Sequence, residues 1–84
     1  MAAPMSDFVR IRLHFENDQF ENTWLLFDNR KCLTIEDVAI EIRNRYGIGR
    51  KEDIVLFLMG HVLRNEEKSK ILRDDDLVCV RYES

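Results

Sequence analysis

Apolar and polar residues alternate along the first part of the chain, and the spacing predicts two strands. In residues 7–15, DFVRIRLHF, four apolar residues alternate with Arg10, Arg12 and His14. This period of two is typical of a half-buried strand. Residues 23–28, TWLLFD, predict a second strand, and the two should pair as a hairpin. Trp24 to Phe27 are all apolar, so the pattern does not show which of them face inward.

The segment TIEDVAIEIRNRYGI, residues 34–48, predicts a helix of about three turns. Thr34 fits the N-cap, and Asp37, three residues later, fits a weak capping box. Gly47 stands where a left-handed C-terminal residue is expected, and Ile48 can pack back on the last turn. Ile40 lies off the apolar stripe and is expected to face outward. The stripe comprises Ile35, Val38, Ala39, Ile42 and Tyr46.

The second half of the chain predicts three more strands. Residues 54–58 form the first, and Met59–Gly60 form a turn into a short strand at 62–63. The polar loop RNEEKSKIL is expected to be anchored by Ile71 and Leu72. Residues 77–82, LVCVRY, form the last strand, with alternate residues on one face.

This order of elements predicts an α+β domain of the β-grasp type. One amphipathic helix must bury its stripe, and a sheet with one apolar face is the surface available for it. We therefore expect a mixed four- to five-stranded sheet with one main helix packed across it. The first and last strands should lie parallel at its centre. Residues 1–6 are expected to be a flexible tail, and residues 7–84 the domain.

Composition narrows the classes of function. The chain has 84 residues, 45% hydrophobic and 35% charged, which suits a single globular domain. Its net charge of -3 argues against a general nucleic-acid binder. No apolar run approaches the length of a membrane span, so no membrane partner is expected. Cys32 and Cys79 are interpreted as reduced, partly buried thiols, with a disulfide or a metal site as the alternative.

The residue types needed for catalysis are not grouped in the sequence. His14 and His61 have no nucleophile nearby, and no Gly-rich phosphate loop is present. Cysteine and histidine are too scattered for a zinc set, so neither a metal nor a cofactor is expected. The chain ends in RYES without a Gly-Gly pair, which argues against a conjugated modifier unless further sequence supplies such a tail. We predict that the domain is not an enzyme.

Several segments resemble known families. The order of elements, the TIEDV helix start and Gly47–Ile48 resemble the ubiquitin-like family. VRIRLHF, WLLFDNRKC, IRNRYG, LFLMGHVL and ILRDDDLVCVRY resemble the N-terminal domain of the coilin family, the scaffold proteins of nuclear Cajal bodies. The resemblance implies a self-association module at the front of a longer, largely disordered chain. It also implies a nuclear, Cajal-body location, and that the present chain is a fragment.

Charged residues predict how such a module would associate. Arg10 and Arg12 should point away from the core on the first strand, beside the last strand. Val55 and Phe57, on the outer face of the third strand, are candidates for an apolar contact. Separate basic and acidic surfaces would let copies bind head to tail, which continues into chains unless a ring closes. The predicted acidic side comprises Asp74, Asp75 and Asp76.

Two alternatives stay open. Arg10 and Asp76 would lie at the same end of the sheet, so the charges can pair within one domain or simply be solvated. The domain can also be a heterotypic module that does not self-associate and binds other nucleolar or Cajal-body proteins, or RNA. Basic side chains beside one aromatic allow a weak RNA contact, which would use Arg10, Arg12, His14, Arg81 and Phe57.

Overall fold

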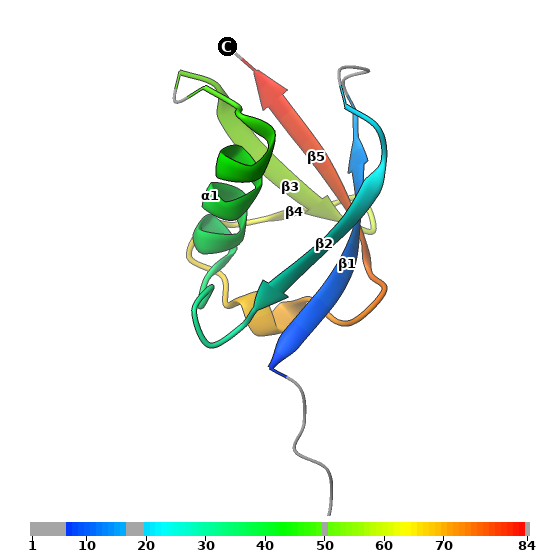
Figure 1. Ribbon diagram of the computed structural model, residues 1–84, viewed down its shortest axis with the longest axis vertical. Helices are drawn as coiled ribbons and strands as arrows, with labels where there is room; N and C mark the ends of the chain where they lie inside the picture. Colours follow the sequence, from blue (N-terminus) through cyan, green and yellow to red (C-terminus); the bar gives the residue numbers. More distant parts are fainter. Residues whose placement is uncertain (1–6, 17–19, 50, 84) are drawn as a thin grey trace, which may run out of the picture.

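The computed structural model describes residues 7–16, 20–49 and 51–83, and these form one sheet covered by one helix (Figure 1). The sheet order is β2-β1-β5-β3-β4. β1 and β5 are parallel, and the other neighbouring pairs are antiparallel. The predicted tail, residues 1–6, lies outside the described residues. The elements are β1 (Phe8–Phe15), β2 (Thr23–Asp28), α1 (Ile35–Tyr46), β3 (Asp53–Leu58), β4 (His61–Leu63), a 3₁₀ helix (Ser69–Ile71) and β5 (Leu77–Glu83).

The two faces of the sheet differ as the alternation in β1 predicts. Val9, Ile11, Leu13 and Phe15 are buried toward α1, whereas Phe8, Arg10, Arg12 and His14 are exposed on the other side. In β2 the run of apolar residues divides, because a strand presents alternate side chains to opposite faces. Leu25 and Phe27 enter the core, and Trp24 and Leu26 remain about half exposed.

The predicted ends of the helix are confirmed. The hydroxyl of Thr34 accepts a hydrogen bond from the backbone N–H of Asp37 at 3.3 Å. The carboxylate of Asp37 in turn accepts one from the backbone N–H of Thr34 at 3.2 Å, which completes the capping box. Gly47 has a φ of 68°, and its N–H bonds to the carbonyl of Arg43. This left-handed conformation suits glycine because it has no Cβ.

The core lies between α1 and the sheet, and one part of it was not predicted. Phe20, in the β1–β2 connection, joins a cluster of aromatic rings around the end of α1. Its ring centroid lies 5.2 Å from that of Phe15 and 5.5 Å from that of Tyr46. Tyr82 of β5 extends the cluster at 6.0 Å. Tilted contacts at these distances are favourable between aromatic rings.

The connection between β4 and β5 corrects one expectation. Leu72 is buried, as predicted, but Ile71 is largely exposed, at 43%. The 3₁₀ helix explains the difference, because it buries Ser69 in place of Ile71. The Ser69 hydroxyl donates a hydrogen bond to the carbonyl of Cys32 at 2.5 Å, which ties this connection to the segment before α1.

Candidate interaction surface

The face of the sheet opposite α1, here called the outer face, carries the predicted basic and apolar residues. It carries three arginines, one histidine and apolar side chains from all five strands. An acidic turn, residues 73–76, adjoins this face where the chain enters β5. The outer face comprises Phe8, Arg10, Arg12, His14, Trp24, Leu26, Val55, Phe57, Val62, Leu77, Cys79 and Arg81.

Main-chain hydrogen bonds fix the acidic turn against β1. The N–H of Arg12 donates to the carbonyl of Asp76 at 2.8 Å, and the N–H of Asp75 donates to the carbonyl of Arg10 at 2.6 Å. Parallel pairing of β1 with β5 begins at Arg12 and Leu77, so the turn prolongs this pairing toward the start of β1. These main-chain hydrogen bonds alone are therefore enough to hold the arginines of β1 next to the aspartates of the turn.

Two of the three predicted aspartates bind main-chain groups. The carboxylate of Asp74 accepts a hydrogen bond from the N–H of Arg10 at 2.9 Å. The carboxylate of Asp76 accepts one from the N–H of Arg73 at 2.8 Å, across the turn. These bonds use the carboxylates as local caps, a common role of aspartate in turns.

Asp75 is the aspartate that binds an arginine side chain. Its φ is 69°, a left-handed conformation that aspartate tolerates better than most residues. Nη2 of Arg10 lies 2.8 Å from Oδ1 of Asp75, and Nε donates to the same oxygen at 3.0 Å. The Arg10 guanidinium also lies 5.1 Å from the centre of the Trp24 ring. Both members of the ion pair are more than half exposed, at 59% and 57%.

Arg12 has a different environment. Its Nε donates a hydrogen bond to the main-chain carbonyl of Asp75 at 2.9 Å. Within residues 7–16, 20–49 and 51–83, no carboxylate forms an ion pair with it. Its neighbours across the sheet are Trp24 on β2 and Leu77 on β5, which are 51% and 44% exposed. A positive charge without an ion-pair partner therefore lies between two exposed apolar side chains.

At the other end of the outer face, Arg81 forms a second cluster. Its Nε lies 2.8 Å from a carboxylate oxygen of Glu16, and its guanidinium lies 4.8 Å from the centre of the Phe57 ring. The hydrogen bond to Glu16 raises the pKa of Arg81 above its ordinary value. Val55 is opposite Arg81 across the sheet. Val55 and Phe57, the predicted apolar contact, are half-buried.

The geometry differs from the expected separation of charges. The basic and acidic residues lie side by side at one end of the sheet, and Arg10 pairs within the domain. The alternative of an intradomain ion pair is thus present, but with Asp75 in place of Asp76. The pairing of Arg81 with Glu16 was missed, although Glu16 follows directly after the last residue of β1 that pairs with β5. Trp24 was missed because its apolar run hid its orientation.

Comparison with known proteins agrees with this fold and these segments. Residues 9–84 match the family model described as the coilin N-terminus. The chain belongs to the coilin family. Human coilin is 31% identical over 83 residues, covering 93% of this chain, and Xenopus laevis coilin is 32% identical over 91 residues, covering 99%. The chain spans 14% and 16% of the lengths of these two coilins.

Solved structures confirm the ubiquitin-like fold expected for this coilin-family domain. The N-terminal ubiquitin-like domain of the 4931431F19Rik protein has a TM-score of 0.74 at 18% identity, covering 100% of this chain and 83% of that one. Caldiarchaeum subterraneum ubiquitin has a TM-score of 0.73 at 14% identity, covering 92% and 95%. At these identities the likeness shows the fold alone. No helix among residues 7–16, 20–49 and 51–83 is long and apolar enough to cross a membrane.

Proposed function

We propose that this domain binds copies of itself and serves as the association module of a nuclear Cajal-body scaffold. Membership of the coilin family supports the scaffold role. The observation that carries the association is Arg12, a cation between two exposed apolar side chains and beside an acidic turn. Arginine and tryptophan are the side chains most enriched at the energetic centres of protein interfaces.

The charges of the outer face are suited to exchange between copies. An exposed ion pair contributes only about 0–1 kcal/mol, so opening the Arg10–Asp75 pair costs little. The carboxylate of Asp75 would then bind an arginine of a neighbouring copy, and Arg12 would gain an ion-pair partner. Several such pairs must act together with apolar burial, because one exposed pair is too weak to hold two chains.

Apolar side chains for that burial surround the arginines. Trp24, Leu26 and Leu77 are each about half exposed and lie on the same face as Arg12. An interface with an aromatic core and a polar rim has this composition. Val55 and Phe57, farther along the face, would contribute less because they are already partly covered. The contact therefore centres on the end of the sheet next to the acidic turn.

The mechanism is multivalency. A weak contact between domains, repeated over many chains, raises the local concentration of whatever each chain carries. If the two sides of the contact are offset, association continues from copy to copy, whereas a twofold arrangement closes as a dimer. Both arrangements use the same arginines and aspartates.

Light scattering on a size-exclusion column tests the proposal. The mean mass should rise with protein concentration at low salt and fall as salt is added, because salt screens exposed charges. Arg12→Gln should lower the mass at every concentration without unfolding the chain. A wild-type chain that stays monomeric at high concentration and low salt would overturn the proposal and favour the heterotypic alternative.

A further inference from the structure

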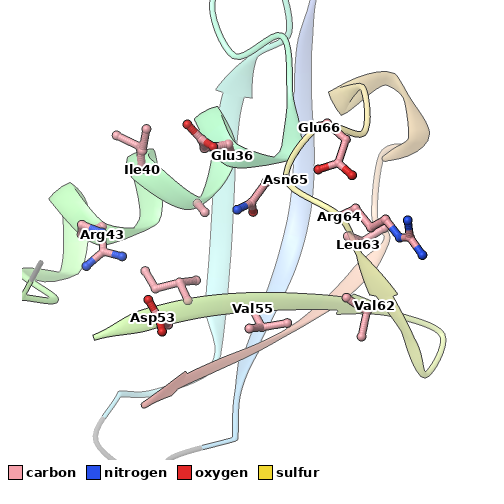
Figure 2. A pocket seen from close by; sticks show the side chains of 12 residues that line it. Glu36, Ile40, Arg43, Asp53, Val55, Val62, Leu63, Arg64, Asn65 and Glu66 are labelled. Atoms are coloured by element: carbon pink, nitrogen blue, oxygen red, sulfur yellow. The ribbon is translucent and has the colours of Figure 1, made fainter. Parts of the chain in front are cut away.

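A groove lies at the β3–β4 edge of the sheet, between α1 and the strands β3 and β4 (Figure 2). This open groove has a volume of about 590 Å³, within the range of ligand-binding clefts. Its floor is apolar and consists of Ala39, Ile54 and Leu63, all of which are buried. Polar and charged residues of α1, β3 and the segment after β4 line the rest.

Two exposed apolar residues line this groove from different elements. Ile40 extends from α1 and is 45% exposed, and Val62 extends from β4 and is 57% exposed. In Figure 2 Ile40 lies on the α1 side of the groove and Val62 on the β4 side, and their side chains point away from each other. A single exposed isoleucine on a helix is ordinary, but here it forms one wall above an apolar floor. Ile40 therefore belongs to a shaped apolar surface.

The groove also contains a strand edge. β4 pairs with Leu56–Leu58 only, so the first half of β3, Asp53–Val55, has β5 on one side and no strand of the described chain on the other. The two-residue turn at Met59–Gly60 makes Leu58 and His61 a hydrogen-bonded pair. By alternation, the backbone of Ile54 points to the same side, beyond the end of β4. An extended peptide can therefore prolong the pairing of β4 along β3.

The charges around the groove favour a basic peptide. Carboxylates of Glu36, Asp53 and Glu66 line it. Of its two arginines, Arg43 donates a hydrogen bond to the carbonyl of Gly49. Arg64 extends away from Ile40 in Figure 2. The lining therefore carries three carboxylates against two guanidinium groups, which leaves it with a net negative charge.

We propose that this groove binds an extended segment of another protein in which apolar residues alternate with lysine or arginine. The apolar side chains cover the apolar floor and the adjoining Ile40 and Val62, and the basic side chains meet the carboxylates of the lining. Main-chain hydrogen bonds to β3 hold the segment, as in other cases of strand addition. The site is separate from Arg12 and does not depend on self-association.

The test is an NMR titration of the ¹⁵N-labelled 84-residue chain with a blocked heptapeptide of alternating lysine and valine. Amide shifts should change at Ile40, Ile54 and Val62, and the outer face around Arg12 should be unaffected. The same peptide with glutamate for lysine should bind more weakly. Absence of saturable shifts at millimolar lysine–valine peptide, or shifts confined to the surroundings of Arg12, would overturn the proposal.

Variants make the assignment specific. Ile40→Ala and Val62→Ala each remove exposed methyl groups and should weaken binding about fivefold while leaving the fold intact. Leu33→Ala, 59% exposed and outside the groove, is the matched control and should bind like wild type. Asp53→Asn should reduce the salt dependence of binding.

An affinity equal to that of wild type in the Ile40→Ala/Val62→Ala double variant would overturn the proposal. Arg12→Gln should leave this titration unchanged, because peptide binding in the groove does not depend on self-association.

Discussion

The side chain of Arg10 binds the carboxylate of Asp75, 65 residues later in the chain, with Nη2 2.8 Å from Oδ1. This ion pair joins β1 to the turn that leads into β5, the strand between β1 and β3. It also joins the two groups of residues that are proposed to meet between copies. Both side chains of the pair are exposed. They can therefore pair with each other within one domain or with the side chains of a neighbouring copy.

The first prediction concerns the free energy of unfolding. Asp75→Asn should change it by less than about 1 kcal/mol, because the pair is exposed and asparagine tolerates a positive φ. Asp76→Ala should cost about 1 kcal/mol, because the N–H of Arg73 loses its acceptor. Urea unfolding of the two variants beside wild type measures both. A larger loss in Asp75→Asn would mean that the ion pair is chiefly structural.

The second prediction concerns pH. Hydrogen bonds from the side chain and backbone N–H of Arg30 hold the pKa of Asp28 below its ordinary value. The carboxylate of Asp28 therefore binds a proton less readily in the folded state than in the unfolded state. The stabilisation is fully present above the ordinary aspartate pKa of about 3.9 and is lost as the pH falls through the lower folded value.

The measurement is urea unfolding across this acidic range for wild type and Asp28→Asn. Asparagine keeps an oxygen acceptor for the Arg30 N–H but does not titrate. The variant should lose less stability than wild type as the pH falls below about 4. Parallel pH profiles for the two proteins would contradict the assignment of this stabilisation to Asp28.

The third prediction tests the end of the helix. Gly47 has a φ of 68°, and a Cβ there would meet no atom within 4 Å. Gly47→Ala should therefore cost about 1 kcal/mol from backbone conformation alone. Gly47→Asn should destabilise the fold less than Gly47→Ala, because asparagine adopts the left-handed conformation more readily than alanine. Thermal and urea unfolding give the comparison, and equal losses in both variants would point to a cause other than φ.

Local signals explain which parts of the structure could be predicted. The capping box at Thr34 and the stop at Gly47 depend on residues within one helical turn, and both are confirmed. The faces of β2 could not be predicted, because four successive apolar residues carry no alternation. Ile71 and Leu72 are adjacent apolar residues in a polar loop, so the sequence did not show which of them is buried. Tertiary packing buries only Leu72.

The candidate surface depends on register and turn geometry, which the sequence does not display. The sequence predicted that Arg10 and Asp76 lie at the same end of the sheet. It did not show that Asp74 and Asp76 bind main-chain groups while Asp75 binds the arginine. That division follows from the hydrogen bonds of the turn and the left-handed conformation of Asp75. The partnership of Glu16 with Arg81 follows likewise from the parallel register of β1 and β5.

The fourth prediction tests self-association by complementation between two variants. Arg12→Glu should lose the basic side of the contact and keep the acidic turn. The double variant Asp74→Asn/Asp75→Asn should lose charge on the acidic side, while its side-chain oxygens still accept the local hydrogen bonds. Each should run as a monomer in light scattering at a concentration where wild type assembles, because like or absent charges remove the pairing.

Mixing the two variants should restore one competent contact per pair of chains. The mass should then rise to that of a dimer and stop there if the contact is head to tail, because each variant can use only one side. Arg64→Glu, a matched charge reversal away from the outer face, should assemble like wild type. A mixture that stays monomeric while both variants remain folded would mean that Arg12 and the acidic turn do not meet across the contact. If Arg12→Glu assembles like wild type, the outer face does not take part in self-association.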